Sequence, residues 1–412
     1  MHRLIFALAL TLACDHDAHE PDDADANEAA TPVVAGAPTN KPDEAHGAKH
    51  LADVETMPNA RAVFAETIKM IEDKYVDSAV DLDALYTGAT IGALARLYQV
   101  GDHPVNSLMS PRELDELTTG TVGAIVGIGV EITNTTGVVT IVHAIPGGPA
   151  EKAGLKPGDR ILGIGEERLQ GLSLAAVVDK IRGAAGTEVD LFVQRDTEEW
   201  HQALTRASVA LQNVVTRTLD GDIGHLELRG FAENTPAELD AAIADLQAKG
   251  MRSLILDLRD CPGGVFDAAI TVTGRFLGKG QTIAGIRERT GETRQFTTEV
   301  DGPHVDKKLQ LAVLVGPHTA SGAEILADAL QTHQRAIVIG QPTLGKDSVE
   351  HVHKLSNGWG LKLSSARLLA ADGQPRAGKG VQPTLPVPAA ETTDDDADAA
   401  LSVARAWLRE RR

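Results

Sequence analysis

Cysteine, aromatic residues and positive charge are all scarce in this chain of 412 residues. It has two cysteines, one near its start and one in an apolar motif, which excludes a disulfide-stapled fold. Aspartate and glutamate number 58 against 39 lysine and arginine, so the formal net charge is −19. We expect no nucleic acid partner, because phosphate binding requires a basic face. With 42% hydrophobic and 24% charged residues, the chain has the composition of a globular protein of two or three domains.

Motifs for bound metals are also absent, since the chain has neither His-Glu-x-x-His nor a paired Cys-x-x-Cys. We therefore expect no metal and no cofactor. The Gly-x-Ser-x-Gly elbow of many serine hydrolases is missing too. A Ser-His-Asp triad with Asp257 as its acid can still be composed from histidines of the second half, although proximity along the sequence does not make a triad. These histidines are His318, His333, His351 and His353.

The N-terminus has a basic start followed by a short, largely apolar run over residues 4–12. That run is too short to span a bilayer, which takes about 20 residues, and it predicts a secretory signal peptide over residues 1–13. Cys14, directly after Leu-Thr-Leu-Ala, resembles the cysteine of a bacterial lipoprotein signal, which implies lipidation there; plain secretion is the alternative. Residues 14–52 are acidic and lack apolar periodicity, so we expect a disordered tether. The start of the chain predicts an exported, periplasmic protein anchored by lipid to a bacterial membrane.

The rest of the chain changes pattern three times. Over residues 53–111 apolar side chains recur at steps of three and four, which predicts a helical segment. Residues 112–206 alternate short strand-like runs with glycine turns. Residues 207–390 alternate buried strands with amphipathic helices, and residues 391–412 carry acids first and arginines last, as a C-terminal helix favours. We therefore expect an α+β protein of several domains.

The glycine-rich region resembles a PDZ domain of the bacterial protease type. The resemblance rests on Gly127-Ile128-Gly129-Val130, on Pro146–Ala150 and on Pro157-Gly158-Asp159. In such a domain a glycine loop offers backbone N–H groups to a peptide's terminal carboxylate, and the next strand pairs with the peptide. Glycine suits this loop because a Cβ blocks close approach of two backbones. The resemblance implies that Gly127, Ile128, Gly129 and Val130 bind peptides or proteins with apolar C-termini.

The second half resembles the C-terminal processing proteases, an S41-type serine peptidase family with a crotonase/ClpP-like α/β core. Three segments carry the resemblance: residues 256–264 (Leu-Asp-Leu-Arg-Asp-Cys-Pro-Gly-Gly), residues 319–324 (Thr-Ala-Ser-Gly-Ala-Glu) and residues 343–346 (Thr-Leu-Gly-Lys). With the preceding domains it covers about residues 55–390. The family pattern implies that Ser321 is the nucleophile, Lys346 its base, and Gly263 an oxyanion donor together with Gly322.

The residues themselves allow this chemistry. Ser321 follows a buried strand and stands where a helix begins, which exposes its hydroxyl and leaves backbone N–H groups free nearby. A serine needs a base, and a lysine can serve when burial favours its neutral form. Taken alone, Ser321 is equally an N-cap and Lys346 a solvated loop lysine. Cys261 has no neighbouring cation to activate it, and we interpret it as a small buried hydrophobic residue.

One departure from the family pattern concerns the lysine loop. The family continues Gly-Lys-Gly and has a Gln four residues after the lysine, whereas this chain has Asp347 and Glu350. In an extended segment positions 346 and 350 project to the same side, so a carboxylate there stabilises the ammonium, which opposes a role as base. Three outcomes stay open: Glu350 is protonated and mimics Gln, it points away, or the enzyme is slow, conditional or inactive.

The sequence thus predicts an exported serine endopeptidase that recognises substrates by their C-terminal tails and uses Ser321, Lys346 and Glu350. The alternative is a catalytically degenerate adaptor of the cell envelope that binds through its PDZ domain. Asp347 and Glu350 motivate this alternative.

Overall fold

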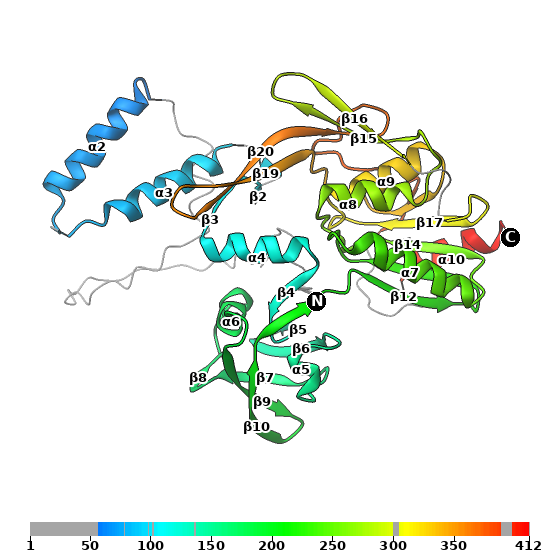
Figure 1. Ribbon diagram of the computed structural model, residues 1–412, viewed down its shortest axis with the longest axis horizontal. Coiled ribbons are helices and arrows are strands. Elements are labelled where there is room, and N and C mark those ends of the chain that lie inside the picture. The colour runs from blue at the N-terminus through cyan, green and yellow to red at the C-terminus, as the bar shows by residue number, and fades with distance from the viewer. Residues whose placement is uncertain are drawn as a thin grey trace, which may run out of the picture. The chain divides into compact units, whose positions relative to one another are not determined.

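The computed structural model describes residues 57–77, 79–97, 99–100, 103–135, 137–299, 305–388 and 398–411 (Figure 1). The predicted signal peptide, the proposed lipidation site at Cys14 and the tether over residues 14–52 lie outside the described residues. The chain divides into two compact units, one of which ends at Pro104 while the other begins at Val105. Among the described residues, no helix is both long and apolar enough to cross a membrane.

The first unit contains the helices that the periodicity predicts. They are α2 (Ala60–Lys74) and α3 (Leu82–Ala95), followed by a small ladder of β1 (Gln99–Val100) and β2 (His103–Pro104). Asp81 caps α3, because its carboxylate accepts a hydrogen bond from the Ala84 N–H at 2.9 Å. Each helix buries a single residue, Ile68 in α2 and Leu94 in α3. The unit therefore has little core of its own.

The second unit starts with β3 (Ser107–Met109), α4 (Pro111–Thr121) and β4 (Ala124–Gly127). A capping box begins α4: the Ser110 hydroxyl accepts from the Glu113 N–H, and the Glu113 carboxylate accepts from the Ser110 N–H at 2.7 Å. The predicted boundary between residues 111 and 112 falls within the first turn of this helix. Strand β4 pairs with β11 (Ala207–Ala210), so the segments before and after the glycine-rich domain lie side by side.

The glycine-rich domain is an antiparallel sheet in the order β10-β9-β7-β6-β5, with β8 beside β7 and two helices. Its alternating side chains bury a separate apolar core that includes Ile132, Ile141 and Leu191. Strand β5 is the last in this order, so no further strand of the described residues continues the sheet beyond it. The elements are β5 (Val130–Thr135), β6 (Val138–Ala144), α5 (Pro149–Lys152), β7 (Arg160–Ile164), β8 (Glu167–Arg168), α6 (Leu174–Ile181), β9 (Glu188–Arg195) and β10 (Glu198–Thr205).

A six-stranded sheet in the order β12-β13-β14-β17-β18-β21 organises the α/β core. All its neighbours are parallel except β12 and β13, which form an antiparallel hairpin. Its elements, with the helices that follow them, are β12 (Val214–Leu219), β13 (Ile223–Leu228), α7 (Thr235–Ala248), β14 (Ser253–Asp257), α8 (Phe266–Gly274), β17 (Gln310–Val315), α9 (Gly322–Thr332), β18 (Ile337–Gly340), β21 (Leu385–Pro386) and α10 (Ala399–Arg409).

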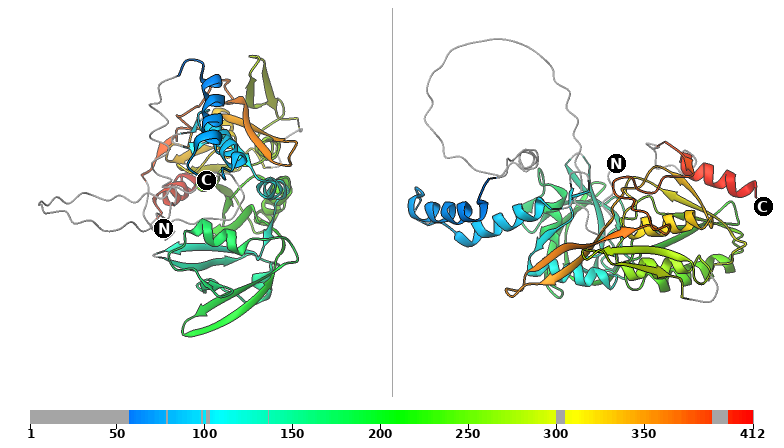
Figure 2. Two further views of the ribbon diagram at one scale, coloured as in Figure 1. Left: turned by 90° about the vertical axis from the view of Figure 1, so that its left-hand side faces the viewer. Right: turned by 90° about the horizontal axis from the view of Figure 1, so that it is seen from above.

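Both faces of this sheet are covered, which explains why its strands are continuously apolar. Every residue of β14 is buried. Leu254 and Leu256 join the core formed with α7, α8 and α9, while Ile255 faces the opposite way and joins the core under α10. Figure 2 (right) shows α10, in red, on the side of the sheet away from α7.

A second sheet flanks the core in the order β16-β15-β20-β19, with β3 added to β20. A turn at Asn357-Gly358 joins its long hairpin, whose strands are β19 (Ser348–Lys354) and β20 (Gly360–Leu369), orange in Figures 1 and 2. The other two strands are β15 (Thr282–Glu288) and β16 (Thr293–Thr297). This sheet positions the lysine loop, because β19 begins two residues after Lys346.

Candidate active site

The predicted nucleophile lies on a sharp strand-to-helix turn. Strand β17 ends at Val315 and α9 begins at Gly322, with Ser321 between them at φ 54° and ψ −117°. This backbone conformation is strained for a residue with a side chain. The Thr319 hydroxyl fixes the turn, since it donates to the Leu258 carbonyl at 2.7 Å and accepts from the Gly316 N–H at 2.9 Å. The turn is thereby tied to the segment that follows β14.

The loop with the predicted oxyanion glycine is pressed against this turn. The Ala320 N–H donates to the Cys261 carbonyl at 3.0 Å. A Cβ added at Gly263 would lie 2.8 Å from both Ser321 Cβ and the Gly322 nitrogen, and Gly263 has φ 99°, so only glycine fits. The structure therefore brings Gly263, Gly322 and Ser321 together. Burial raises the pKa of the Cys261 thiol to about 12, with the Gly263 N–H opposing it, which agrees with an inert buried cysteine.

Glu324 is a site residue that the sequence analysis missed. Its Oε2 accepts from the backbone N–H of Ser321 at 2.8 Å and from that of Lys346 at 3.0 Å. Its Oε1 accepts from the Gly345 N–H at 2.7 Å and from the Thr343 hydroxyl at 2.6 Å. Burial raises the pKa of the Glu324 carboxyl, although all four hydrogen bonds oppose this effect. The sequence contains a signal that points to Glu324, because a glutamate three residues after a serine at a helix start is a capping-box pattern.

This carboxylate connects the two loops that hold the predicted catalytic pair. Both predicted residues bind the same oxygen atom through their main chains. A direct backbone hydrogen bond supports the connection, since the Leu344 N–H donates to the Thr319 carbonyl at 3.0 Å. The lysine loop and the nucleophile turn are therefore held side by side at their backbones.

The side chain of Lys346 has a carboxylate partner. Its Nζ lies 2.7 Å from Glu350 Oε2, and the two side chains are 19% and 12% exposed. The prediction that positions 346 and 350 project to the same side is thus confirmed, and the possibility that Glu350 points away is wrong. Among the described residues, the hydrogen bond of this ammonium goes to Glu350 and not to the Ser321 hydroxyl.

Asp347, the other acid of the lysine loop, is used differently. It is buried and forms an ion pair with Arg367 of β20 at 2.9 Å. An arginine that neutralises this carboxylate reduces its effect on the neighbouring lysine. Of the two acids that depart from the family pattern, Glu350 therefore dominates the surroundings of Lys346.

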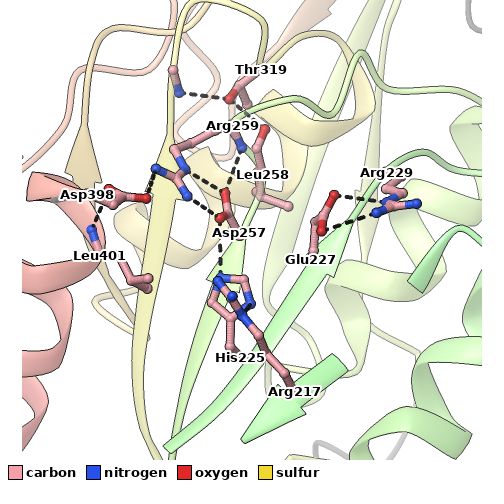
Figure 3. A network of polar contacts seen from close by, with 11 residues as sticks. Arg217, His225, Glu227, Arg229, Asp257, Leu258, Arg259, Thr319, Asp398 and Leu401 are labelled. Atoms are coloured by element: carbon pink, nitrogen blue, oxygen red, sulfur yellow. Dashed lines mark hydrogen bonds and ion pairs between the residues drawn. The ribbon is translucent and has the colours of Figure 1, made fainter. Parts of the chain in front are cut away.

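Asp257 belongs to a buried network and not to a triad with the predicted histidines (Figure 3). It ends β14 and contacts His225 Nε2 at 3.3 Å and the Arg259 guanidinium at 2.6 Å. Burial alone would raise the pKa of the Asp257 carboxyl, but the hydrogen bonds from His225 and Arg259 outweigh it and hold the pKa well below its usual range. Arg259 also contacts Asp398, the N-cap of α10, at 2.6 Å.

The histidines proposed for the triad have other surroundings. His333 Nε2 lies 2.7 Å from the Thr282 carbonyl, and His351 Nδ1 contacts the Ser365 hydroxyl. His353 is exposed on β19, and His318 interacts electrostatically with Asp260. Asp257 is occupied by His225 and Arg259, so the structure gives no support to the Ser-His-Asp alternative, against which the sequence already argued.

The glycine-rich domain holds a cavity of about 430 Å³. Its rim includes the four predicted residues Gly127, Ile128, Gly129 and Val130, and its apolar wall continues along α6. Helix α4 forms a further wall, held to the α6 region by two ion pairs at 2.8 Å, Arg112–Asp179 and Glu116–Arg182. The cavity therefore lies beside the free edge of β5, where an added peptide strand can pair.

Comparison with known proteins matches the two domains separately. The model of peptidase family S41 matches residues 222–387, and a PDZ domain model matches residues 140–195. The carboxy-terminal processing protease CtpA of Bacillus subtilis is 32% identical over 318 residues, which cover 77% of this chain and 66% of that protein. The carboxy-terminal-processing protease of Bartonella bacilliformis is also 32% identical, over 79% of this chain and 74% of that protein.

The fold agrees with a solved structure. A Bacteroides fragilis protein assigned to the S41 proteases superposes with a TM-score of 0.54 over 87% of this chain and 99% of that chain. Its sequence is 17% identical, so the comparison concerns the fold alone.

Proposed function

Because this chain belongs to peptidase family S41 and carries a PDZ domain, we propose that it is a serine endopeptidase that selects proteins by their C-terminal tails. The names of its relatives describe carboxy-terminal processing for those proteins. The observation that carries the proposal is the shared Glu324 oxygen, which holds Ser321 and Lys346 on adjacent loops. Export to the periplasm and lipid attachment at Cys14 belong to the same proposal.

In the proposed reaction Ser321 attacks a peptide carbonyl while neutral Lys346 accepts the hydroxyl proton. Lys346 then gives that proton to the leaving amine, and water hydrolyses the acyl-enzyme. The N–H groups of Gly263 and Gly322 are the proposed donors to the oxyanion, and the position of both glycines beside Ser321 supports this role. Before the first step, the Lys346 ammonium has to give up its proton, either after it moves away from Glu350 or while it stays in contact with that carboxylate.

The PDZ domain supplies recognition in this proposal. The apolar cavity beside β5 suits an apolar terminal side chain, and the loop over residues 127–129 offers N–H groups to the terminal carboxylate. Tail capture raises the local concentration of the substrate at the protease core. A protein without a suitable C-terminus is then a poor substrate even if its cleavage site is accessible.

Labelling with a serine-reactive probe tests the proposed nucleophile and base. Ser321→Ala should abolish labelling and cleavage of tailed peptides, whereas Ser356→Ala, in the hairpin turn between β19 and β20, should change neither. In the parent protein labelling should rise with pH, and Lys346→Ala should remove that rise. Cleavage at the parent level in a folded Ser321→Ala protein would reject Ser321 as the nucleophile.

The ion pair between Lys346 and Glu350 favours a second candidate, a tail-binding adaptor without peptidase activity. Glu350→Gln separates the two candidates. If Glu350 restrains an active enzyme, this substitution should raise turnover at neutral pH, because the ammonium loses its carboxylate partner. If neither form turns over substrate while both bind tailed peptides, the adaptor is favoured.

The proposed lipid attachment has its own test. Cells that express the full chain are fed a labelled fatty acid, and the protein should incorporate it. Cys14→Ser should abolish incorporation, while Cys261→Ser serves as the matched control, because that thiol is buried in the α/β core. Equal incorporation into the parent and Cys14→Ser proteins would reject lipidation at this residue.

A further inference from the structure

A second lysine lies next to Glu350 on the neighbouring strand. In the ladder of β19 and β20, Val352 is opposite Lys362 and Glu350 is opposite Ser364. Residues directly opposite each other share a face, and so do residues two apart along a strand. Glu350 and Lys362 are therefore diagonal neighbours on one face of the hairpin, within reach of two long side chains.

Lys362 is in an unusual position for a charged residue, since it is 4% exposed. A buried ammonium is costly unless a carboxylate compensates it. The charged groups that act on Lys362 are Glu350 and Lys346. Strand β3 covers the other edge of β20 here and contributes no charged side chain, because it consists of Ser107, Leu108 and Met109. Glu350 is thus the one carboxylate acting on Lys362 among the described residues.

The Glu350 carboxylate has room for a second partner. Its Oε2 binds Lys346, whereas its Oε1 is buried and has no hydrogen-bond partner among the described residues. Burial lowers the pKa of the Lys362 ammonium to about 8, with the charge of Glu350 opposing this effect and that of Lys346 adding to it. Lys362 is therefore still mainly protonated at neutral pH and can balance a carboxylate.

We propose that Lys362 is the counter-ion of Glu350 and thereby sets the protonation of Lys346, as a positioning residue of the catalytic pair. The catalytic part of this statement rests on the proposed function, in which Lys346 is the base. Up to about pH 8, where Lys362 keeps its own proton, loss of the Lys346 proton leaves the buried negative charge of Glu350 compensated by Lys362. Without Lys362 the same step leaves a lone buried carboxylate, so the Lys346 ammonium is retained. Lys362 thus allows a glutamate at a position where the family pattern has Gln.

The test measures the protonation of Lys346 directly and needs no enzymatic activity. The full chain with Ser321→Ala is treated briefly with acetic anhydride between about pH 6 and pH 11, a range that brackets lysine titration. Acetylation of Lys346 is then quantified by peptide mass spectrometry. Because only the neutral amine reacts, the pH of half-maximal acetylation reports the loss of its proton.

Four variants are compared in this background. Lys362→Met should raise the pH of half-maximal acetylation by about one unit, because Glu350 then pairs with Lys346 alone. Glu350→Gln should lower it by about one unit, because two ammonium groups then face each other. The double variant Glu350→Gln/Lys362→Met should return to within about 0.3 of the parent, since the two charge changes cancel. Lys362→Arg keeps a positive charge over the whole pH range and should not raise the value.

Each protein is first shown to be folded by its thermal unfolding transition, and Lys362→Gln replaces the methionine variant if that variant does not fold. An unchanged acetylation pH in a folded Lys362 variant overturns the inference. The inference is also overturned if Lys362→Met raises the pH of half-maximal acetylation and the double variant Glu350→Gln/Lys362→Met does not return to the parent value. Probe labelling of wild-type Ser321 is measured separately: an unlabelled, inactive protein whose Lys346 still responds to Lys362 overturns the proposed function and leaves the counter-ion assignment standing.

Discussion

At the scale of single residues, Glu324 has the largest influence on the geometry of the candidate site. It is buried, and its two oxygen atoms accept four hydrogen bonds from three backbone N–H groups and one hydroxyl. All four donors belong to the two loops that hold Ser321 and Lys346. A buried carboxylate with this many donors fixes the positions of those donors as firmly as a packed side chain does.

Glu324→Gln is expected to impair both stability and activity. The amide presents N–H groups where one pair of donors now points, so those donors lose their acceptor at a cost of about 1–3 kcal/mol. The shift between the two loops should lower cleavage of a tailed peptide by about 100-fold. Urea unfolding and peptide cleavage measure the two effects. Glu292→Gln, at an exposed turn, is the matched control, and parent-like activity in Glu324→Gln would contradict this account.

The Asp257 carboxylate predicts a specific acid sensitivity. Its pKa in the folded protein lies below its ordinary value of 3.8, so its stabilising effect is complete above that pH and disappears as the pH falls through the folded value. Asp257→Asn should cost about 3 kcal/mol at neutral pH, because it breaks a buried pair. The difference from the parent in urea unfolding should shrink below about pH 4. A difference that is constant with pH would assign the loss to packing.

Ser321, Lys346 and Gly263 could be predicted as site residues from the sequence, because each stands in a short motif that resembles the family pattern, and the structure brings their three segments together. Glu324 was in the same pattern but its partners, Thr343 and Gly345, lie on another loop. Lys362 could not be singled out, since a lysine on a strand ordinarily faces solvent. What distinguishes Lys362 is its burial in the folded chain, where β3, from more than 250 positions earlier, pairs with its strand.

At the scale of elements, the strands of the central sheet were predictable, because a strand covered on both faces is continuously apolar. The apolar runs Ile223–Leu228, Ser253–Leu258 and Leu309–Val315 predict three of them. Strand β13 has the predicted bounds, and β14 and β17 differ by a single residue at one end. Strands β15, β16 and β19 were missed, because their many polar side chains resemble a loop. The pairing of β4 with β11 was also invisible, since the two segments are about 80 residues apart.

The loop over residues 127–129 of the PDZ domain, which is proposed to bind the terminal carboxylate of a peptide, gives a prediction at this scale. Gly129 has φ 72°, and a Cβ there would lie 3.2 Å from Gly148 Cα. Gly129→Ala should therefore distort the loop and weaken binding of a tailed peptide by about tenfold or more, measured by fluorescence anisotropy. Gly158→Ala is the matched control, because φ there is 91° with open space around the site. Equal binding by both variants would contradict a role of this loop in tail capture.

At the scale of the whole molecule, the second unit is held together by three separate apolar cores. The last of them exists because α10 returns to cover the sheet face opposite α7, α8 and α9. The sequence predicted this helix from its charge distribution, but not the place where it packs. That place follows from the alternation of Ile255, Leu314 and Ile339 toward one face and from the contact of Arg259 with Asp398.

Leu401→Ala tests the contribution of α10. This side chain is fully buried in the third core, so its truncation should destabilise the protein by about 2–5 kcal/mol in urea unfolding. Leu97→Ala, at a side chain that is 51% exposed, should cost less than about 0.5 kcal/mol. If the two variants unfold at the same urea concentration, the packing of α10 contributes little to the fold.

The shared oxygen of Glu324 also restricts how such an enzyme can be switched off. If the serine turn and α9 separate from the lysine loop, the buried Glu324 carboxylate loses three of its four donors, those of Thr343, Gly345 and Lys346, which costs much free energy and makes such a separation rare. An inactive state costs less free energy if only the Lys346 amine turns toward a carboxylate, or if the peptide plane before Gly263 tilts. Inactive and active forms of this enzyme should thus follow nearly the same main-chain path and differ in one side-chain rotamer or one peptide plane, and compounds that stabilise the inactive arrangement offer a way to inhibit it.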